Sequence, residues 1–221
     1  YLDKMPENQK EIYYISAETR SQALASPHLE GFKSKNIPVL IMTDAIDQFW
    51  LPMIGSFKDK KFTSITQGQI NLDDLDEKNK DKKSENKDQK EKQDKEFVDL
   101  IAQMKVVLGE QVKDIRLSSK LTDSPVCLVA DDGDMDIAME QLMAQRDTNY
   151  KGAPRILEIN GDHSLIKNMK SLLSKKENND LVSDAGTLLF EQARLLEGKM
   201  PADPAQFSKI MNQFLIKAIP E

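Results

Sequence analysis

The stretch Ile37-Pro-Val-Leu-Ile-Met-Thr43 decides how the first part of the chain folds, and Asp44 follows it directly. A continuous apolar run of this length is typical of a buried strand, and proline is tolerated near the start of one. A similar apolar run, Ile12–Ser16, precedes it along the chain. The two runs therefore predict two strands of one sheet.

Short helical patterns fill the interval between these strands. Thr19–Ala25 and Pro27–Lys35 each have the length and pattern of a short helix. Lys61–Thr66 has the pattern of a third strand. Because strand–helix–strand order favours parallel pairing, residues 1–72 are predicted to form a small α/β unit with helices on the faces of the sheet.

A further helix is expected directly after the second strand. Asp44 stands where an N-cap residue is preferred, and apolar residues continue to Met53 at helical spacing. Pro52 is expected to end or kink this helix, because proline disrupts a helix interior. Ile46 is expected to face the sheet.

Residues 73–96 separate the chain into two parts by their charge. These 24 residues include 10 acidic and 8 basic side chains, with Leu75 as the one apolar residue. Such a stretch cannot bury enough apolar surface to fold alone. Since charges of both signs are interleaved and glycine and proline are absent from it, a partly helical state stays open. We predict a spacer, because the acids cancel the lysines that nucleic acid would need.

Residues 97–221 are predicted to form an α+β domain. An apolar helical stripe begins at Phe97 and stops at Gly109, a residue that commonly ends helices. The later segments with strand patterns are Val112–Leu117, Pro125–Ala130 and Arg155–Asn160. Asp162 is expected to cap a helix that follows the last of these strands.

A helix predicted over Asp134–Arg146 carries three methionines four residues apart, Met135, Met139 and Met143. Leu142 shares their face, because positions three and four apart stack along a helix. Methionine is unbranched and polarizable, so such a face can adapt to many partners. From the pattern alone, packing into the chain's own core is the commoner explanation and a binding surface is the alternative.

The last two helices have the broadest apolar faces in the chain, and the second of them opens after Asp203-Pro204. The residues on these faces are Leu188, Leu189, Leu195, Leu196, Phe207, Ile210, Met211, Phe214 and Leu215. Faces this broad need partners on both sides, which a short helical hairpin cannot supply. Pairing of two copies into a four-helix bundle is one solution. Covering the preceding sheet is the other, and the pattern leaves both open.

Composition argues against several classes of protein and site. The net charge of −6 disfavours nucleic acid as the main partner, and no apolar run approaches the length of a membrane span. Cys127 is the only cysteine and lies in an apolar run, so we expect an inert thiol and a reducing, cytoplasmic compartment. His28 and His163 have no second ligand at metal-binding spacing, so no zinc site is predicted.

Two groups of aspartates are candidates for metal sites. The first group is Asp131, Asp132, Asp134 and Asp136. It fails the register of a calcium loop, because the required glycine would fall at Ile137. Asp44 with Asp47 suits a magnesium-dependent phosphotransfer enzyme, but helix capping is the commoner role of such residues. No catalytic set can be assembled from the sequence.

Three segments of the first part are Glu11-Ile-Tyr-Tyr-Ile-Ser, Ser26-Pro-His-Leu-Glu and Val39-Leu-Ile-Met-Thr-Asp-Ala-Ile-Asp-Gln-Phe. Later segments are Val112-Lys-Asp-Ile-Arg-Leu, Leu121-Thr-Asp-Ser-Pro, and Arg155-Ile-Leu-Glu-Ile-Asn with Asp162-His163. In this order they resemble the middle and carboxyl-terminal domains of the heat shock protein 90 chaperones. Asp203-Pro204 followed by Met211-Asn212-Gln213 is similar to the bacterial form of that family, HtpG. The resemblance covers essentially the whole chain.

The resemblance implies a parent protein that is an ATP-driven, homodimeric chaperone. This chain begins at Tyr1 in mid-pattern and is expected to be a fragment of that parent. The ATP and magnesium of the parent would bind in an amino-terminal domain, so the fragment is not expected to hydrolyse ATP. No catalytic, cofactor or metal residues are expected in it. The chain ends at Glu221 without the acidic Met-Glu-Glu-Val-Asp tail of cytosolic eukaryotic members, so co-chaperones that dock on such a tail are not expected.

The resemblance also implies a division of the chain and its binding surfaces. Residues 1–72 would be the end of the middle domain, 73–96 the spacer, and 97–221 the dimerisation domain, whose terminal helices form the interface. The implied contacts with non-native client proteins are Gln48, Phe49, Trp50, Met135, Met139, Leu142 and Met143. The three methionines should then be at least partly exposed. The alternatives are a pure dimerisation scaffold with the methionines in its core, and a phosphotransfer enzyme centred on Asp44.

Overall fold

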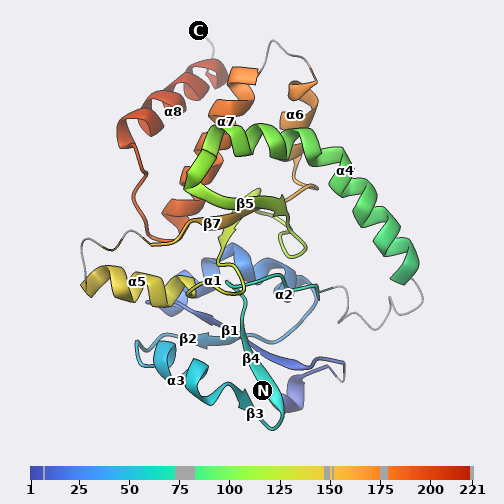
Figure 1. Ribbon diagram of the computed structural model, residues 1–221, viewed down its shortest axis with the longest axis vertical. Coiled ribbons are helices and arrows are strands. Elements are labelled where there is room, and N and C mark those ends of the chain that lie inside the picture. Colours follow the sequence, from blue (N-terminus) through green and yellow to red (C-terminus); the bar gives the residue numbers. More distant parts are fainter. Residues whose placement is uncertain (7, 73–82, 147–149, 151, 175–178, 220–221) are drawn as a thin grey trace.

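Two small sheets, each with helices packed on it, organise the chain in the computed structural model (Figure 1). The structure describes residues 1–6, 8–72, 83–146, 150, 152–174 and 179–219. The first sheet belongs to residues 1–72, which we call the first lobe. The second sheet belongs to residues 83–219, the second lobe, which lies above the first in Figure 1.

The first sheet is built around β1 (Glu11–Ser16). β1 pairs in parallel with β2 (Leu40–Met42) on one side and with β4 (Lys60–Ser64) on the other, as the strand–helix–strand order predicts. A two-residue strand, β3 (Ser56–Phe57), pairs antiparallel with β4. The turn between them has φ of 47° at Lys58 and 62° at Asp59, the signs that a two-residue hairpin needs. This hairpin was missed because it lacks the usual Asn-Gly pair.

The helices of the first lobe are η1 (Leu2–Lys4), α1 (Arg20–Ala25), η2 (Pro27–Leu29), α2 (Glu30–Ser34) and α3 (Asp47–Ile54). Thr19 caps α1, because its hydroxyl accepts the N–H of Gln22 at 3.2 Å. The helix predicted over Pro27–Lys35 is thus split into a 3₁₀ turn and a short α-helix.

The predicted start of α3 is wrong. The helix begins at Asp47, whose carboxylate accepts the backbone N–H of Asp44 at 3.2 Å, so Asp44 is not its cap. Ile46 is 63% exposed and does not face the sheet. Pro52 lies inside the helix, which continues to Ile54 and ends at Gly55 with a φ of 69°.

The second sheet has β7 (Arg155–Ile159) at its centre, and every residue of this strand is buried. β5 (Val112–Leu117) pairs with it in parallel, and β6 (Val126–Val129) pairs with it antiparallel. All three strands lie where the sequence predicts them. The mixture of parallel and antiparallel pairs with flanking helices fits the predicted α+β class.

The helices of the second lobe are α4 (Lys83–Leu108), η5 (Gly109–Gln111), α5 (Ile137–Arg146), α6 (Ser164–Leu173), α7 (Asn179–Leu196) and α8 (Pro204–Ala218). The residue that caps α6 is His163, whose Nδ1 accepts the N–H of Leu165 at 3.1 Å, and the expectation for Asp162 is therefore wrong. Asp203 caps α8 through the N–H groups of Ala205 and Gln206.

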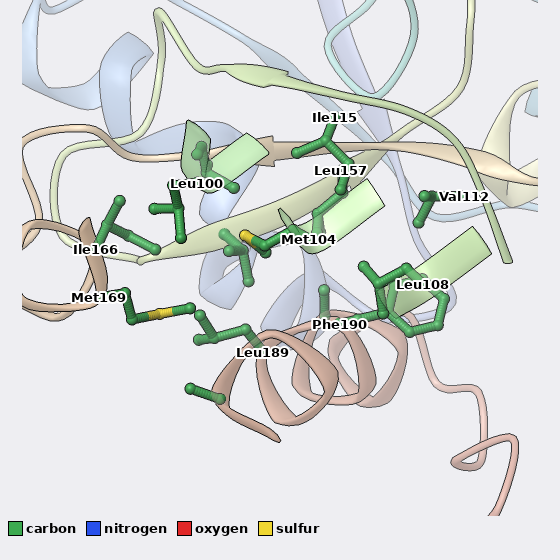
Figure 2. Packing of buried hydrophobic residues seen from close by; sticks show 14 of the residues in the cluster. Leu100, Met104, Leu108, Val112, Ile115, Leu157, Ile166, Met169, Leu189 and Phe190 are labelled. Atoms are coloured by element: carbon green, nitrogen blue, oxygen red, sulfur yellow. The ribbon is translucent and has the colours of Figure 1, made fainter. Parts of the chain in front are cut away.

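The main core lies between the second sheet and the helices α4, α6 and α7. Figure 2 shows the side chains of α4 pointing toward those of the sheet and of α7, with Met104 near the centre. Met104, Leu157 and Leu189 are each at most 3% exposed. Burial of one such side chain contributes roughly 1.5–3 kcal/mol, so this cluster supplies most of the apolar stabilisation of the second lobe.

Part of the predicted spacer is helical. Residues 83–96 form the first half of α4, which continues into the core without a break, and residues 73–82 lie outside the described part of the chain. The division expected between residues 96 and 97 therefore falls inside one helix. Among the described helices, none has both the length and the apolar character needed to cross a membrane.

The two lobes are joined by buried polar contacts. Lys120, which is 2% exposed, leaves the second lobe and donates to the carbonyl of Ile65 at 2.8 Å. Arg116 donates to the carbonyl of Gly68 at 3.0 Å. A Cβ on Gly31 would lie 2.6 Å from the carbonyl oxygen of Lys120, so only glycine allows this approach. The lobes are packed against each other at close range.

Candidate functional site

A groove of about 280 Å³ lies between α3 of the first lobe and α5 of the second. Its walls include Gln48 from α3 and Leu142 from α5, which belong to the two client surfaces expected from the sequence. Gln145 donates across it to the carboxylate of Glu18 at 2.9 Å. The fold therefore brings two segments distant in sequence to one groove, which we call the α3–α5 groove.

Asp136 determines where α5 begins and holds it to the first lobe. One carboxylate oxygen accepts the N–H of Ala138 at 2.9 Å, as an N-cap does. The other accepts hydroxyl groups from Ser64 at 2.5 Å and Thr66 at 2.8 Å. Met135 consequently lies before the helix, and the prediction of three methionines on one helix starting at Asp134 is wrong.

The methionines are accessible in the described chain. Met135 is 39% exposed, and Met139, Leu142 and Met143 are half-buried. The buried residues of α5 are Ile137 and Glu140. Figure 1 shows α5 extending outward at the level between the lobes. The alternative in which the methionine face is core therefore does not describe this chain, whereas client binding by these residues stays a prediction.

A buried charge cluster joins α5 to β7 and to the segment that follows α7. Glu140, 3% exposed, lies 2.6 Å from the guanidinium of Arg155 and 2.9 Å from the ammonium of Lys199. Burial alone would raise the pKa of Glu140, but the hydrogen bond from Lys199 and the charge of Arg155 outweigh it and hold the pKa below its usual range. The sequence showed only a glutamate within an apolar stripe, because its partners are far along the chain.

The predicted surface on α3 is only partly free. Gln48, Phe49 and Trp50 are all half-buried. The Trp50 indole donates to Asp47 at 2.7 Å and packs edge-to-face on Phe62, with ring centroids 6.1 Å apart. More exposed apolar side chains in this region, which the sequence does not mark as a surface, are Ile46 directly before α3, Met53 and Ile54 on α3, and Phe57 on β3.

The residues of the predicted dimer interface differ in how far this chain buries them. Leu189 and Ile210 are buried within this chain at 3% and 4% exposure, so they cannot form a free surface. Leu188, Phe207 and Phe214 are half-buried, and the exposed members are Leu195, Leu196, Met211 and Leu215. Leu196 lines a pocket between the lobes. Ile216 and Ile219, each 73% exposed, extend the apolar face of α8 and its end and were missed.

Neither group of aspartates forms a metal site. Asp47 already accepts from Asp44 and Trp50, and Lys113 pairs with Asp131 at 2.8 Å and Asp134 at 3.0 Å. Across the described residues, no cluster of three or more histidine, cysteine, aspartate or glutamate side chains is arranged to hold a metal ion. Cys127 is buried, and burial raises the pKa of its thiol. The geometry gives no support to the phosphotransfer alternative.

The α3–α5 groove is a concave surface between two packed lobes, and the residues described around it do not assemble a catalytic set. Comparison with known proteins gives the class. The family model described as Hsp90 protein matches residues 1–220, so this chain belongs to the Hsp90 family.

Relatives that are named "Chaperone protein HtpG" match over nearly the whole chain. The one from Roseobacter denitrificans is 40% identical over 221 residues, which is 99% of this chain and 35% of the relative. Those from Wolbachia pipientis and Streptomyces coelicolor are 37% and 36% identical and are covered over 34% and 32% of their length. The chain thus spans about one third of these relatives and is of the bacterial HtpG type.

Proposed function

We propose that this chain is the part of an Hsp90-type chaperone that binds non-native proteins and pairs two copies of the parent. The family match and the chaperone names of the relatives support this proposal. In it, residues 1–72 end the middle domain and 97–221 form the dimerisation domain. ATP, magnesium and the ATPase reaction belong to the remaining two thirds of the parent, which acts in the cytoplasm.

The α3–α5 groove is the observation that carries the client-binding proposal. Its largely polar wall on the first lobe includes Glu18, Asp44 and Gln48, and its α5 wall consists of Ala138, Gln141, Leu142 and Gln145, while Met139 and Met143 are half-buried beside it on the same helix. A flexible methionine face adapts to many sequences, and glutamines at the rim can bond to exposed backbone. Individual contacts should be weak and tolerant of sequence, as in other promiscuous binders.

A protection assay tests this surface. We expect Leu142→Glu, at a residue that lines the groove, and Met143→Glu, at the next residue of α5, to weaken the ability of the chain to suppress aggregation of a heat-unfolded protein, with an unchanged melting temperature. Val106→Glu is the matched control, because Val106 is 79% exposed on α4 and lies outside the groove. Equal protection by all three variants would contradict client binding at this groove.

Dimerisation is proposed to join α7 and α8 of two copies in a four-helix bundle. The exposed apolar residues Met211, Leu215 and Ile216 on α8 support this arrangement. Burial of such surface stabilises association by roughly 25 cal/mol per Å². Sedimentation equilibrium should show a dimer that Leu215→Glu weakens, whereas Met53→Glu, at an 85% exposed site on α3, leaves it intact. A dimer unaffected by Leu215→Glu excludes the bundle.

The absence of ATP hydrolysis from this segment is also a proposal. The purified chain should show no phosphate release from ATP with magnesium above that of a heat-denatured sample. Measurable turnover by the pure chain would overturn it.

A further inference from the structure

A second cavity, of about 60 Å³, lies between the lobes and has no part in the chaperone function proposed above. We call it the interlobe pocket. Its walls come from β1, α1 and η2 of the first lobe and from β6, the start of α5 and the end of α7. The apolar part of the wall includes Ile15, Ala23, Ile137 and Leu196.

The polar part of the wall includes three side chains with buried polar atoms that lack a hydrogen-bond partner, beside Gln22, Ser26, Thr66 and Gln141. Both carboxylate oxygens of Glu197, the Nδ1 of His28 and the hydroxyl oxygen of Ser16 are buried and have no hydrogen-bond partner in the described chain. Glu197 and His28 are 9% and 6% exposed. A buried polar group without a partner is unfavourable, so three of them in one pocket indicate a missing donor.

The protonation of His28 makes its Nδ1 an acceptor. Burial, and then the charge of Lys120, lower the pKa of His28 well below its usual value, so the ring is neutral. A hydrogen bond to the backbone of Leu128 uses the other ring nitrogen, because Nδ1 has no partner. The Nδ1 lone pair is thus left without a partner, and His28 is one of the residues that line the pocket.

The neighbouring donors have other partners at shorter distance. The ammonium of Lys199 donates to Glu140 at 2.9 Å and lies 3.5 Å from one carboxylate oxygen of Glu197, so it offsets part of the charge of Glu197. Lys120 donates to a backbone carbonyl at 2.8 Å and lies 3.9 Å from Glu158. Gln141 donates at 2.5 Å to the backbone carbonyl of Glu197 and leaves the carboxylate unbonded. A ligand with several donors would therefore complete this pocket.

We propose that the interlobe pocket binds a primary alkylammonium group, with its nitrogen against Glu197, His28 and Ser16 and its alkyl chain against the apolar wall. An ammonium has three donors and no acceptor, and Glu197, His28 and Ser16 can each accept a hydrogen bond. Burial raises the pKa of Glu197 to about 7, so above that pH the positive charge of the ligand adds to that of Lys199 in compensating the buried carboxylate. A cavity of about 60 Å³ has room for roughly four or five water-sized groups, the length of a butylammonium.

Titration of the complete chain with n-butylammonium chloride tests this proposal. We expect saturable binding by calorimetry, together with shifts of the Ile15 and Ile137 methyl resonances, because both side chains line the pocket. 1-Butanol, which keeps the chain but lacks the charge, and tetramethylammonium, which keeps the charge but lacks donors, should bind at least about 10-fold more weakly. Equal binding of butanol, or shifts confined to other methyl groups, would overturn the proposal.

Matched variants separate this site from general attraction to a negatively charged protein. Glu197→Gln keeps the shape of the side chain and should weaken butylammonium binding at least about 10-fold. Glu18→Gln removes an exposed carboxylate nearby and should leave the affinity unchanged. If Glu197→Gln lowers the melting temperature, Ser16→Ala, which removes one acceptor, should still weaken binding. Loss of affinity in Glu18→Gln alone, or no saturable binding at all, contradicts the proposal and leaves a pocket filled by water only.

The same chemistry has two sources, a free aliphatic amine and a lysine side chain of a bound protein. Titration with Nα-acetyl-lysine N-methylamide distinguishes them. Affinity equal to that of butylammonium supports a pocket that accepts lysine side chains from outside. Binding of butylammonium without binding of the lysine derivative supports a site for free amines.

Discussion

Replacement of Glu140 by glutamine tests the buried charge cluster that Glu140 of α5 forms with Arg155 and Lys199. The wild-type carboxylate accepts from Arg155 at 2.6 Å, from Lys199 at 2.9 Å and from the N–H of Ala153 at 3.2 Å. Glutamine keeps the volume but removes the charge. Lys199 can turn toward solvent, because its side chain is 32% exposed, whereas the Arg155 side chain, at 3% exposure, cannot.

The magnitude follows from the charge that is left behind. Removal of one partner of a buried ion pair costs about 3 kcal/mol or more, since the other charge stays buried without compensation. For a chain of this size we expect the melting temperature of Glu140→Gln to fall by roughly 6–12 °C. The free energy of unfolding is measured by urea denaturation, followed by circular dichroism.

Two controls make the reasoning refutable. Glu96→Gln breaks an exposed ion pair with Lys170 and should cause no measurable change. Glu140→Leu combined with Arg155→Met replaces the buried pair by apolar side chains and should recover most of the loss. If Glu140→Gln is as stable as Glu96→Gln, or if the double variant is no better than Glu140→Gln, the cluster does not hold α5 in the way the distances indicate.

The same cluster has a predictable pH dependence. The pKa of Glu140 is lowered in the folded chain from a reference value of 4.5, so its stabilisation is fully present above pH 4.5. It is lost as the pH falls below that value and through the folded pKa. The difference in stability between wild type and Glu140→Gln should therefore be constant near neutral pH and shrink below pH 4.5.

Three further predictions concern other parts of the fold. Burial raises the pKa of Glu197 from 4.5 to about 7, so the stability of the wild type should fall as the pH rises through this interval. Glu197→Gln should therefore be more stable than the wild type at pH 8, by up to about 3 kcal/mol, and should have no advantage at pH 4. Urea denaturation at both pH values measures the difference. Gly31→Ala places a Cβ 2.6 Å from the carbonyl of Lys120 and should destabilise the chain by roughly 1–3 kcal/mol, whereas Gly133→Ala, where nothing lies within 4 Å, should be nearly neutral. Met104→Ala in the main core should cost about 2–5 kcal/mol in calorimetry, and a smaller loss would mean that the cluster in Figure 2 collapses around the cavity.

Periodicity predicted the regular elements well, because their apolar faces are local properties of the sequence. The parallel pairing of β1 with β2 follows from such patterns. The first half of α4 could be given only as an open alternative, since a charged segment has no apolar stripe to mark it as helix. The second half of α4 is packed in the core, and the charged first half continues the same helix.

Choices between similar residues were less predictable. Four aspartates lie between residues 131 and 136, and each suits a helix start. Asp136 is the cap because Ser64 and Thr66, distant in sequence, also bond to it. The buried charges Lys120, Glu140 and Glu197 were missed for the same reason, because only the fold brings their surroundings together.

Lys120 has a consequence for motion between the lobes. Its ammonium donates to a carbonyl of the first lobe while its stem stays buried, and Gly31 lies directly against its backbone. A rotation that separates the lobes would break the hydrogen bond of the Lys120 ammonium before the gap is wide enough for water, so intermediate angles are unfavourable. The interface should consequently switch between a closed and a hydrated arrangement, with few conformations in between, and amide exchange at Ile65 and Lys120 should report the same opening event.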